Sequence, residues 1–339
     1  MTTPARKFMT GVACAAAAVI ALTGCAANGD AGSANASKGG DTVTLIVHDS
    51  FPNEDFAKAA SEATGYDVKV VSAGDGGELT SQLVLTQSAP IADAFFGVDN
   101  VYLSRLIDGG VIAGEDAAKP VTQSATCINI DPAWFAEHGV AEPTSYEDLI
   151  DEQYKGLSVI LDPSTSTTGA SFLIGTIAKF GEEGFADYWK KLAANDTRVE
   201  QGWTEAYNGQ FTQGGGDGTY PIVLSYSSSP AWTVTEDGTA TTTKALLDTC
   251  STQIEYAGVL EGAANPDGAQ AVVDYMLSRE FQDTIADTMY VYPVDPEGYV
   301  PAEWEQFAPM PSAPNDLTPA EVGKGRDVWL KEWSEATGW

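Results

Sequence analysis

The sequence predicts an α/β protein of two lobes with a ligand cleft between them. Its first part alternates apolar strands with helices at the spacing of a parallel sheet with right-handed crossovers. Similar strands and helices return after an apolar crossing segment at residues 121–130. About 300 residues follow the N-terminal leader, which is enough for two hydrophobic cores.

The N-terminus has the pattern of an exported lipoprotein. Two basic residues precede an apolar run at residues 11–22 that is too short to span a bilayer, which predicts a signal peptide over residues 1–24. Residues 22–25 resemble the lipobox of bacterial lipoproteins, in which the cysteine, here Cys25, receives the lipid. The alternative is a secreted protein in which this cysteine is incidental. Residues 25–40 are rich in Ala, Gly, Ser and Asn and predict a flexible tether. We therefore expect the protein outside the cytoplasmic membrane, on a lipid anchor.

The composition excludes several kinds of partner and of chemistry. Lys and Arg total 17 against 48 Asp and Glu, and the formal charge of −31 argues against nucleic acid and anionic membrane surfaces as partners. The same charge suits a cationic ligand, although solubility explains it equally well. Only His48 and His138 are present, and the common nucleophile, nucleotide-binding and zinc-protease motifs do not occur. We therefore expect a binding protein without cofactor or metal, not an enzyme.

Two cysteines remain for the folded part of the chain. Cys14 leaves with the signal peptide, and Cys25 would carry the lipid. In an oxidising compartment Cys127 and Cys250 form either one disulfide bond or a pair of buried thiols. The disulfide is the prediction.

The first part of lobe 1 is predicted at residues 41–123, and each of its strands ends near an acidic residue. Strands are predicted at 43–47, 68–71 and 94–98, with helices at 55–63, through Leu79 to Leu85, and up to Gly109. Asp49, Asp75 and Asp99 follow the three strands. Each alone is an ordinary helix cap or turn residue. Together, at one edge of a sheet, they indicate a cleft that suits a positively charged or amine-bearing ligand.

Lobe 2 is predicted at residues 124–258 and contains a hydroxyl-rich loop. The predicted elements are helices at 133–139 and 145–151, a strand at 157–161, and helices at 170–180 and 185–192. The loop at 162–169 contains Ser166 and Thr167 and opens into a helix N-terminus, which suits an anion or a phosphate. Such loops are also common as plain helix caps.

Residues 201–232 are the predicted centre of the ligand site. Trp203, Tyr207 and Phe211 are four apart and fall on one helical face, and a buried strand is predicted at 222–225. The polar loop after that strand leads into a helix start at Ser229-Pro230, which is where ligands bind in open α/β sheets. Its candidate contact residues are Tyr226, Ser227, Ser228, Ser229 and Trp232. The alternative is that these aromatic residues belong to the core and the serines form turns.

The remainder, residues 259–339, is predicted to return to lobe 1. A strand at 256–260, a helix at 270–277 and a strand at 289–294 lead to a C-terminal helix. A capping box from Thr318 to Glu321 begins this helix. Its two core-facing tryptophans are predicted to pack rather than to bind ligand.

Several short motifs occur in one order along almost the whole mature chain. They are HDSF at 48–51, GVDN at 97–100, DPSTST at 162–167, GWTEAY at 202–207, LSY at 224–226 with SPA at 229–231, YPV at 292–294 and LTPAEV at 317–322. This series resembles the thiamine-binding proteins of bacterial ABC uptake systems. The resemblance implies a periplasmic-binding-protein fold, type II-like, in which crossing strands join the two lobes. It also implies a monomeric lipoprotein that captures thiamine or its phosphate esters and delivers them to an ABC permease with its ATPase.

The resemblance also implies particular ligand contacts. Carried over position by position, they are Asp75, Gly76, Ser166, Thr167, Trp203, Tyr226, Ser227, Ser228 and Ser229. Trp232 and Tyr290 stand where the family also has aromatic residues, and His48 stands where it has a Tyr. Aromatic rings would stack on the aminopyrimidine and the thiazolium for about 0.5–2 kcal/mol each. Carboxylates would offset the cation, and hydroxyls would hold a hydroxyl or phosphate.

Two other functions stay open from the sequence. One is capture of a different ligand by the same fold, such as a polyamine, an iron complex or a phosphonate. The other is a secreted thiamine-degrading enzyme, which would need Cys127 or Cys250 as its nucleophile.

Overall fold

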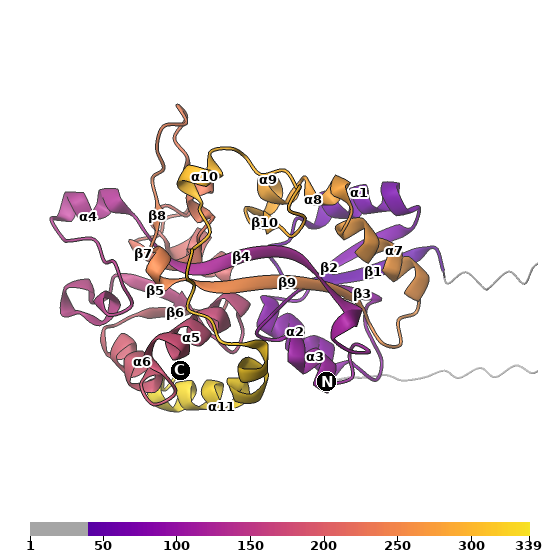
Figure 1. Ribbon diagram of the computed structural model, residues 1–339, viewed down its shortest axis with the longest axis horizontal. Helices are drawn as coiled ribbons and strands as arrows, with labels where there is room; N and C mark the ends of the chain where they lie inside the picture. Colours follow the sequence, from indigo (N-terminus) through magenta and orange to yellow (C-terminus); the bar gives the residue numbers. More distant parts are fainter. Residues whose placement is uncertain (1–39) are drawn as a thin grey trace, which may run out of the picture. The chain divides into compact units, whose positions relative to one another are not determined.

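The computed structural model describes residues 40–339 (Figure 1). The predicted signal peptide, most of the predicted tether and Cys25 lie outside the described residues. No helix within residues 40–339 is long and apolar enough to cross a membrane.

A mixed sheet organises the described chain. Its strands are β1 (Thr42–Val47), β2 (Asp67–Ser72), β3 (Ala94–Asp99), β4 (Ala118–Ile130), β5 (Ser158–Leu161), β6 (Arg198–Glu200), β7 (Ile222–Tyr226), β8 (Lys244–Ala245), β9 (Ser251–Val259) and β10 (Tyr292–Pro293). The order is β2-β1-β3-β9-β4-β7-β5-β6, and β8 and β10 also pair with β4. β1 is parallel to β2 and β3, and β5 is parallel to β6 and β7. The long strands β4 and β9 run antiparallel side by side between these two parallel groups and join them (Figure 1).

Helices cover both faces of this sheet. They are α1 (Asn53–Thr64), α2 (Gly76–Leu85), α3 (Leu103–Asp108), α4 (Pro132–His138), α5 (Thr167–Phe180), α6 (Phe185–Ala194), α7 (Pro266–Met276), α8 (Arg279–Gln282), α9 (Ile285–Met289), α10 (Trp304–Phe307) and α11 (Pro319–Thr337). β1 shows why both faces need cover, because its side chains alternate between two cores. Val43, Leu45 and Val47 pack in the core that contains residues of α1 and α7, and Ile46 packs in the core of α2 and α3.

Most of the predicted starts and stops are confirmed. Gly65 ends α1 in the left-handed conformation at φ 76°, which glycine adopts without strain. Asp75 caps α2, and Ser166 caps α5 by accepting from the backbone N–H of Gly169. The predicted capping box at Thr318 is present at the start of α11. Local chemistry is enough to place these ends, because the three side-chain caps bond a backbone N–H within three residues and Gly65 bonds the carbonyl of Ser61 four residues back.

One predicted helix of lobe 2 differs from the structure. The helix predicted at 145–151 is wrong, since only short 3₁₀ turns form at Asp148–Ile150 and Glu152–Tyr154. The carboxylate of Asp148 accepts from the backbone N–H groups of Thr144 and Ser145, which bends the chain into a turn there.

The strands near the C-terminal part also have different limits. β9 begins at Ser251, five residues before the predicted start at 256. The strand predicted at 289–294 shrinks to Tyr292–Pro293. The strand starts later than predicted because α9 extends to Met289 and Tyr290 then adopts the left-handed conformation.

The C-terminal helix α11 contacts elements from both parallel groups. Arg326 donates to the carbonyl of Val101 and to the hydroxyl of Ser104 beside α3, at 3.2 and 2.9 Å. Trp333 meets Trp189 of α6 edge-on, with ring centroids 5.9 Å apart. The tryptophans at positions 329 and 333 are buried, as predicted for packing residues. The boundaries of the lobes at 123 and 258 remain predictions.

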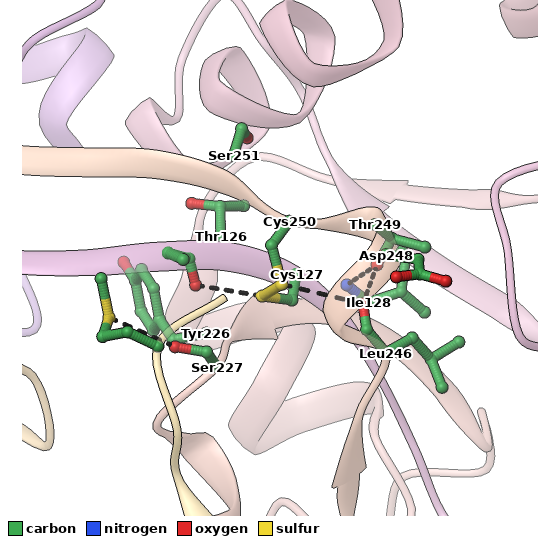
Figure 2. The surroundings of a disulfide bond; sticks show 12 residues. Thr126, Cys127, Ile128, Tyr226, Ser227, Leu246, Asp248, Thr249, Cys250 and Ser251 are labelled. Atoms are coloured by element: carbon green, nitrogen blue, oxygen red, sulfur yellow. Dashed lines mark hydrogen bonds between the residues drawn. A yellow bond between two sulfur atoms is a disulfide. The ribbon is translucent and has the colours of Figure 1, made fainter. Parts of the chain in front are cut away.

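The predicted disulfide between Cys127 and Cys250 is present (Figure 2). Cys127 lies in β4, and Cys250 immediately precedes β9, so the bond ties together the two strands that join the parallel groups. Both cysteines are fully buried. Neither is therefore available as a catalytic nucleophile.

Candidate ligand-binding site

One cavity of about 260 Å³ lies where segments from distant parts of the chain meet. It is lined by His48, Ser50, Trp203, Tyr207, Asn208, Tyr226, Ser229, Trp232, Glu255, Thr288, Met289, Tyr290 and Val291. The predicted site residues among them are Trp203, Tyr226, Ser229, Trp232 and Tyr290. The structure therefore brings the predicted aromatic residues to one place.

Trp203 is held on three sides. Its ring stacks on Tyr207 with centroids 4.9 Å apart and planes 11° apart, as the four-residue spacing predicted. Its indole N–H donates to the hydroxyl of Ser225 at 2.8 Å, and its backbone N–H donates to Asp75 Oδ2 at 3.0 Å. The turn that follows is π-helical, at Glu205–Gln210, a widened geometry that often occurs at functional sites. The indole is therefore presented in a fixed orientation.

Tyr226 and Ser229 form the cavity wall at the end of β7. The Tyr226 hydroxyl shares a hydrogen bond of 2.8 Å with the Thr168 hydroxyl. Burial raises the pKa of Tyr226 well above its usual value, which keeps this hydroxyl protonated. Ser229 Oγ accepts from the Tyr226 backbone N–H at 3.1 Å and bonds Ser225 Oγ at 2.7 Å. Ser229 thus fixes the loop as well as lining the cavity.

Trp232 and Tyr290 form a second aromatic wall. Their rings meet edge to face, with centroids 4.9 Å apart and planes 88° apart. Trp232 is 56% exposed and stands at the rim. Tyr290 has φ 54°, a conformation that costs a non-glycine residue about 1–2 kcal/mol. Its carbonyl accepts from the Ser228 hydroxyl at 2.6 Å, which helps to hold it there. Ser228 therefore supports this wall, although it does not line the cavity.

His48 and Glu255 lie side by side in the cavity lining. His48 Nε2 lies 3.3 Å from Glu255 Oε1, and His48 Nδ1 bonds the Ser50 hydroxyl at 3.1 Å. The Thr122 hydroxyl donates to Glu255 Oε2 at 2.6 Å. His48 belongs to one of the motifs found in the sequence, whereas Glu255 was not predicted as a site residue. An acidic residue between Ile254 and Tyr256 was the available signal, but the strand was predicted to begin one residue later.

Four predicted contacts pack against one another outside the cavity lining. Asp75 Oδ1 accepts from the backbone N–H groups of Gly76 at 2.6 Å and of Thr167 at 3.1 Å. A Cβ on Gly76 would come within 2.3 Å of Thr167 Cγ2, so this approach of α2 to α5 requires glycine. Ser166 is fully buried as the cap of α5. Burial raises the pKa of Asp75, against the hydrogen bonds that lower it.

The remaining predicted residues also lie outside the cavity lining. Asp49 is exposed. Ser227 is buried, and its hydroxyl lies 3.8 Å from Met310 Sδ. Asp99 is fully buried and accepts from the backbone N–H groups of Val101 and Tyr102.

Asp99 gives a prediction for stability. Burial raises the pKa of its carboxyl to about 8, so between about pH 4 and pH 8 the folded chain keeps a proton that the unfolded chain loses. The free energy of unfolding should therefore fall as pH rises through this window. Asp99→Asn removes this loss and should stabilise the protein by about 1–3 kcal/mol at pH 8, with the gain shrinking towards pH 4. Urea denaturation at both pH values measures it.

The control for this prediction is an exposed acid. Asp217→Asn, in the exposed part of the glycine-rich loop, should leave the pH dependence as in the wild type. A wild-type slope in the Asp99 variant would contradict the assignment.

Several named proteins are similar to this chain over most of its length. The thiamine-binding periplasmic protein of Escherichia coli (strain K12) is 28% identical over 311 residues, covering 87% of this chain and 93% of the relative. The thiamine-binding periplasmic protein of Brucella suis biovar 1 is 30% identical over 325 residues, covering 90% of this chain and 95% of the relative. A solved periplasmic thiamin binding protein superposes with a TM-score of 0.75 at 28% identity, over 87% of this chain and 96% of that one.

These comparisons confirm the coarser predictions. The two-lobed periplasmic-binding-protein fold is shared with the solved structure. The relatives are periplasmic binding proteins rather than enzymes, so this chain is an extracytoplasmic solute-binding protein and the alternative of a thiamine-degrading enzyme is wrong. Residues 112–313 match the family of bacterial extracellular solute-binding proteins. The chain belongs to that family of bacterial extracellular solute-binding proteins.

Proposed function

We propose that this protein captures thiamine outside the cytoplasmic membrane and delivers it to an ABC importer. The observation that carries the proposal is the aromatic cavity, in which Trp203, Tyr226, Trp232 and Tyr290 present rings from separate segments. Flat, positively charged heterocycles bind such rings by stacking and by cation–π attraction. The names of the relatives point to the same ligand.

In this proposal the predicted polar residues outside the cavity hold the two lobes together instead of contacting the ligand. Asp75 binds the N-terminus of α2 and also accepts from Thr167 and Trp203, which follow the crossing strand β4 in the chain. These bonds join segments of the two predicted lobes. Asp75, Gly76, Ser166 and Thr167 therefore favour the closed arrangement around the ligand, and Ser227 and Ser228 support the cavity walls.

Capture follows from hinge motion about the crossing strands. The lobes at residues 41–123 with 259–339 and at 124–258 close on the ligand by bending β4 and β9. A ligand that contacts both lobes binds the closed form more tightly and shifts the population towards it. The closed monomer then docks on the permease, whose ATPase drives uptake.

A lipid on Cys25 would keep the protein close to that permease. The expected result is that wild-type protein made in a bacterial host partitions into the detergent phase, and that Cys25→Ser protein remains aqueous. Phase separation in Triton X-114, followed by immunoblotting, distinguishes the two. An aqueous wild type would show that the chain is released without a lipid.

Isothermal titration calorimetry tests the proposed ligand. Thiamine, its phosphate esters, spermidine, ferric citrate and a phosphonate are titrated separately into the purified protein. One-to-one binding of thiamine, tighter than that of spermidine, ferric citrate and the phosphonate, is the expected result. Binding of one of those three with no heat from thiamine would assign the cavity to that ligand instead.

A further inference from the structure

The cavity lining has an unusual balance of charge for a phosphate site. Of the described residues that line it, Glu255 carries a carboxylate and none is Lys or Arg. His48 is the only basic side chain there, and it already lies 3.3 Å from Glu255. Aromatic ring faces add negative electrostatic potential. The cavity therefore favours a cation and opposes an anion.

The N-terminus of α5, which the sequence predicted as a seat for an anion, and the N-terminus of α2 both donate to acceptors within the chain. Asp75 Oδ1 accepts from Gly76 N–H at the start of α2 and from Thr167 N–H at the start of α5. Its second oxygen accepts from Trp203 N–H. Ser166 Oγ accepts from Gly169 N–H, a further donor of the first turn of α5. The Asp75 carboxylate and the Ser166 hydroxyl thus already accept from the backbone N–H groups that a phosphate would need as donors.

Glu255 is placed to act on a ligand in the cavity. Its side chain is 13% exposed, and Thr122 fixes one of its oxygens by a hydrogen bond of 2.6 Å. The other oxygen faces the imidazole of His48. A fixed carboxylate that is largely buried acts more strongly on a charged ligand than one at an exposed surface.

We propose that Glu255 selects an organic cation without a phosphate group. This inference rests on the proposed function, because it makes the ligand of that same cavity unphosphorylated thiamine. Glu255 attracts the thiazolium, and it repels the dianionic phosphate of an ester held in the same position. No Lys, Arg or free helix N-terminus compensates for that repulsion in the described lining.

The test compares two charge states of one ligand on matched variants. Thiamine, thiamine monophosphate and spermidine are titrated by calorimetry into wild type, Glu255→Gln, Glu255→Asp and Asp49→Asn. Glutamine keeps an oxygen that accepts from Thr122 but lacks the charge, and aspartate keeps the charge. Asp49→Asn removes one exposed charge near His48 and serves as the matched control. Thermal melts confirm that each variant folds.

We expect Glu255→Gln to change the preference for thiamine over thiamine monophosphate as well as the affinity for thiamine. Wild type should bind thiamine at least about tenfold more tightly than thiamine monophosphate, and Glu255→Gln should reduce this ratio about tenfold or more. Glu255→Asp should retain the preference for thiamine. Asp49→Asn should bind both compounds as the wild type does.

Other outcomes separate this inference from the proposed function. Equal binding of thiamine and its monophosphate, with no change of ratio in Glu255→Gln, would overturn charge selection and leave thiamine capture standing. Binding of spermidine alone, weakened by Glu255→Gln, would refute thiamine capture and support selection of a cation. Absence of binding by all three compounds would refute both.

Discussion

Replacing Trp203 by alanine is expected to weaken thiamine binding by about 2–4 kcal/mol, or about 30- to 1,000-fold. The indole is half-buried, lines the cavity and is held by its stack on Tyr207 and its hydrogen bond to Ser225. A ring fixed in this way loses little conformational freedom when a ligand stacks on it. Calorimetry with the wild type and the variant measures the difference in dissociation constant.

Two further tryptophan variants show whether the loss of affinity in Trp203→Ala comes from the aromatic ring at this position. Trp203→Phe keeps a ring that can stack on Tyr207 and loses the N–H to Ser225, so it should retain part of the affinity. Trp232→Ala removes an exposed ring at the rim and should cost less than Trp203→Ala. An unchanged dissociation constant in Trp203→Ala would remove this residue from the site.

Removal of the disulfide is expected to lower the free energy of unfolding by about 3–5 kcal/mol. Cys127 and Cys250 are 123 positions apart, and cross-linking so long a loop reduces the entropy of the unfolded chain. The bond also lies where β4 meets the start of β9, beside the serine loop that supports the cavity (Figure 2). Urea denaturation of the variant with both cysteines changed to alanine measures the loss.

The reduced wild type is the control for this experiment. It lacks the cross-link but keeps both sulfur atoms, so it separates loop entropy from the loss of packing in the small core around Ala125. We expect it to be destabilised almost as much as the double variant. A loss below about 1 kcal/mol in both would contradict a stabilising role for the bond.

The local parts of the fold follow from short stretches of sequence. Asp75, Ser166 and Thr318 cap helices through bonds within a few residues, and Gly65 ends one by its backbone freedom. The parallel pairing of β1, β2 and β3 follows from the alternation of strands and helices. Similarly, the stack of Trp203 on Tyr207 follows from their spacing on one helical face.

Contacts between residues far apart in the chain could not be predicted in this way. Glu255 is a cavity residue because Thr122 and His48, far away in the chain, come to lie beside it. Tyr290 keeps its left-handed backbone next to Trp232 and Ser228. Asp75 was predicted from its place after a strand, but its bonds to Thr167 and Trp203 exist only once α2 meets α5.

The sequence by itself determined several helix ends, the strand periodicity and the stack of Trp203 on Tyr207, since each depends on side-chain type and nearby spacing. It also determined the disulfide partners, because only two cysteines remain for the folded part of the chain. Tertiary structure alone decided which carboxylate faces the cavity and which is used to join helices. Strand β9 pairs with β4 and β3 over long sequence separations, and that pairing sets the position of Glu255. The physical reason is that burial and electrostatic contact depend on distances in space that no local pattern encodes.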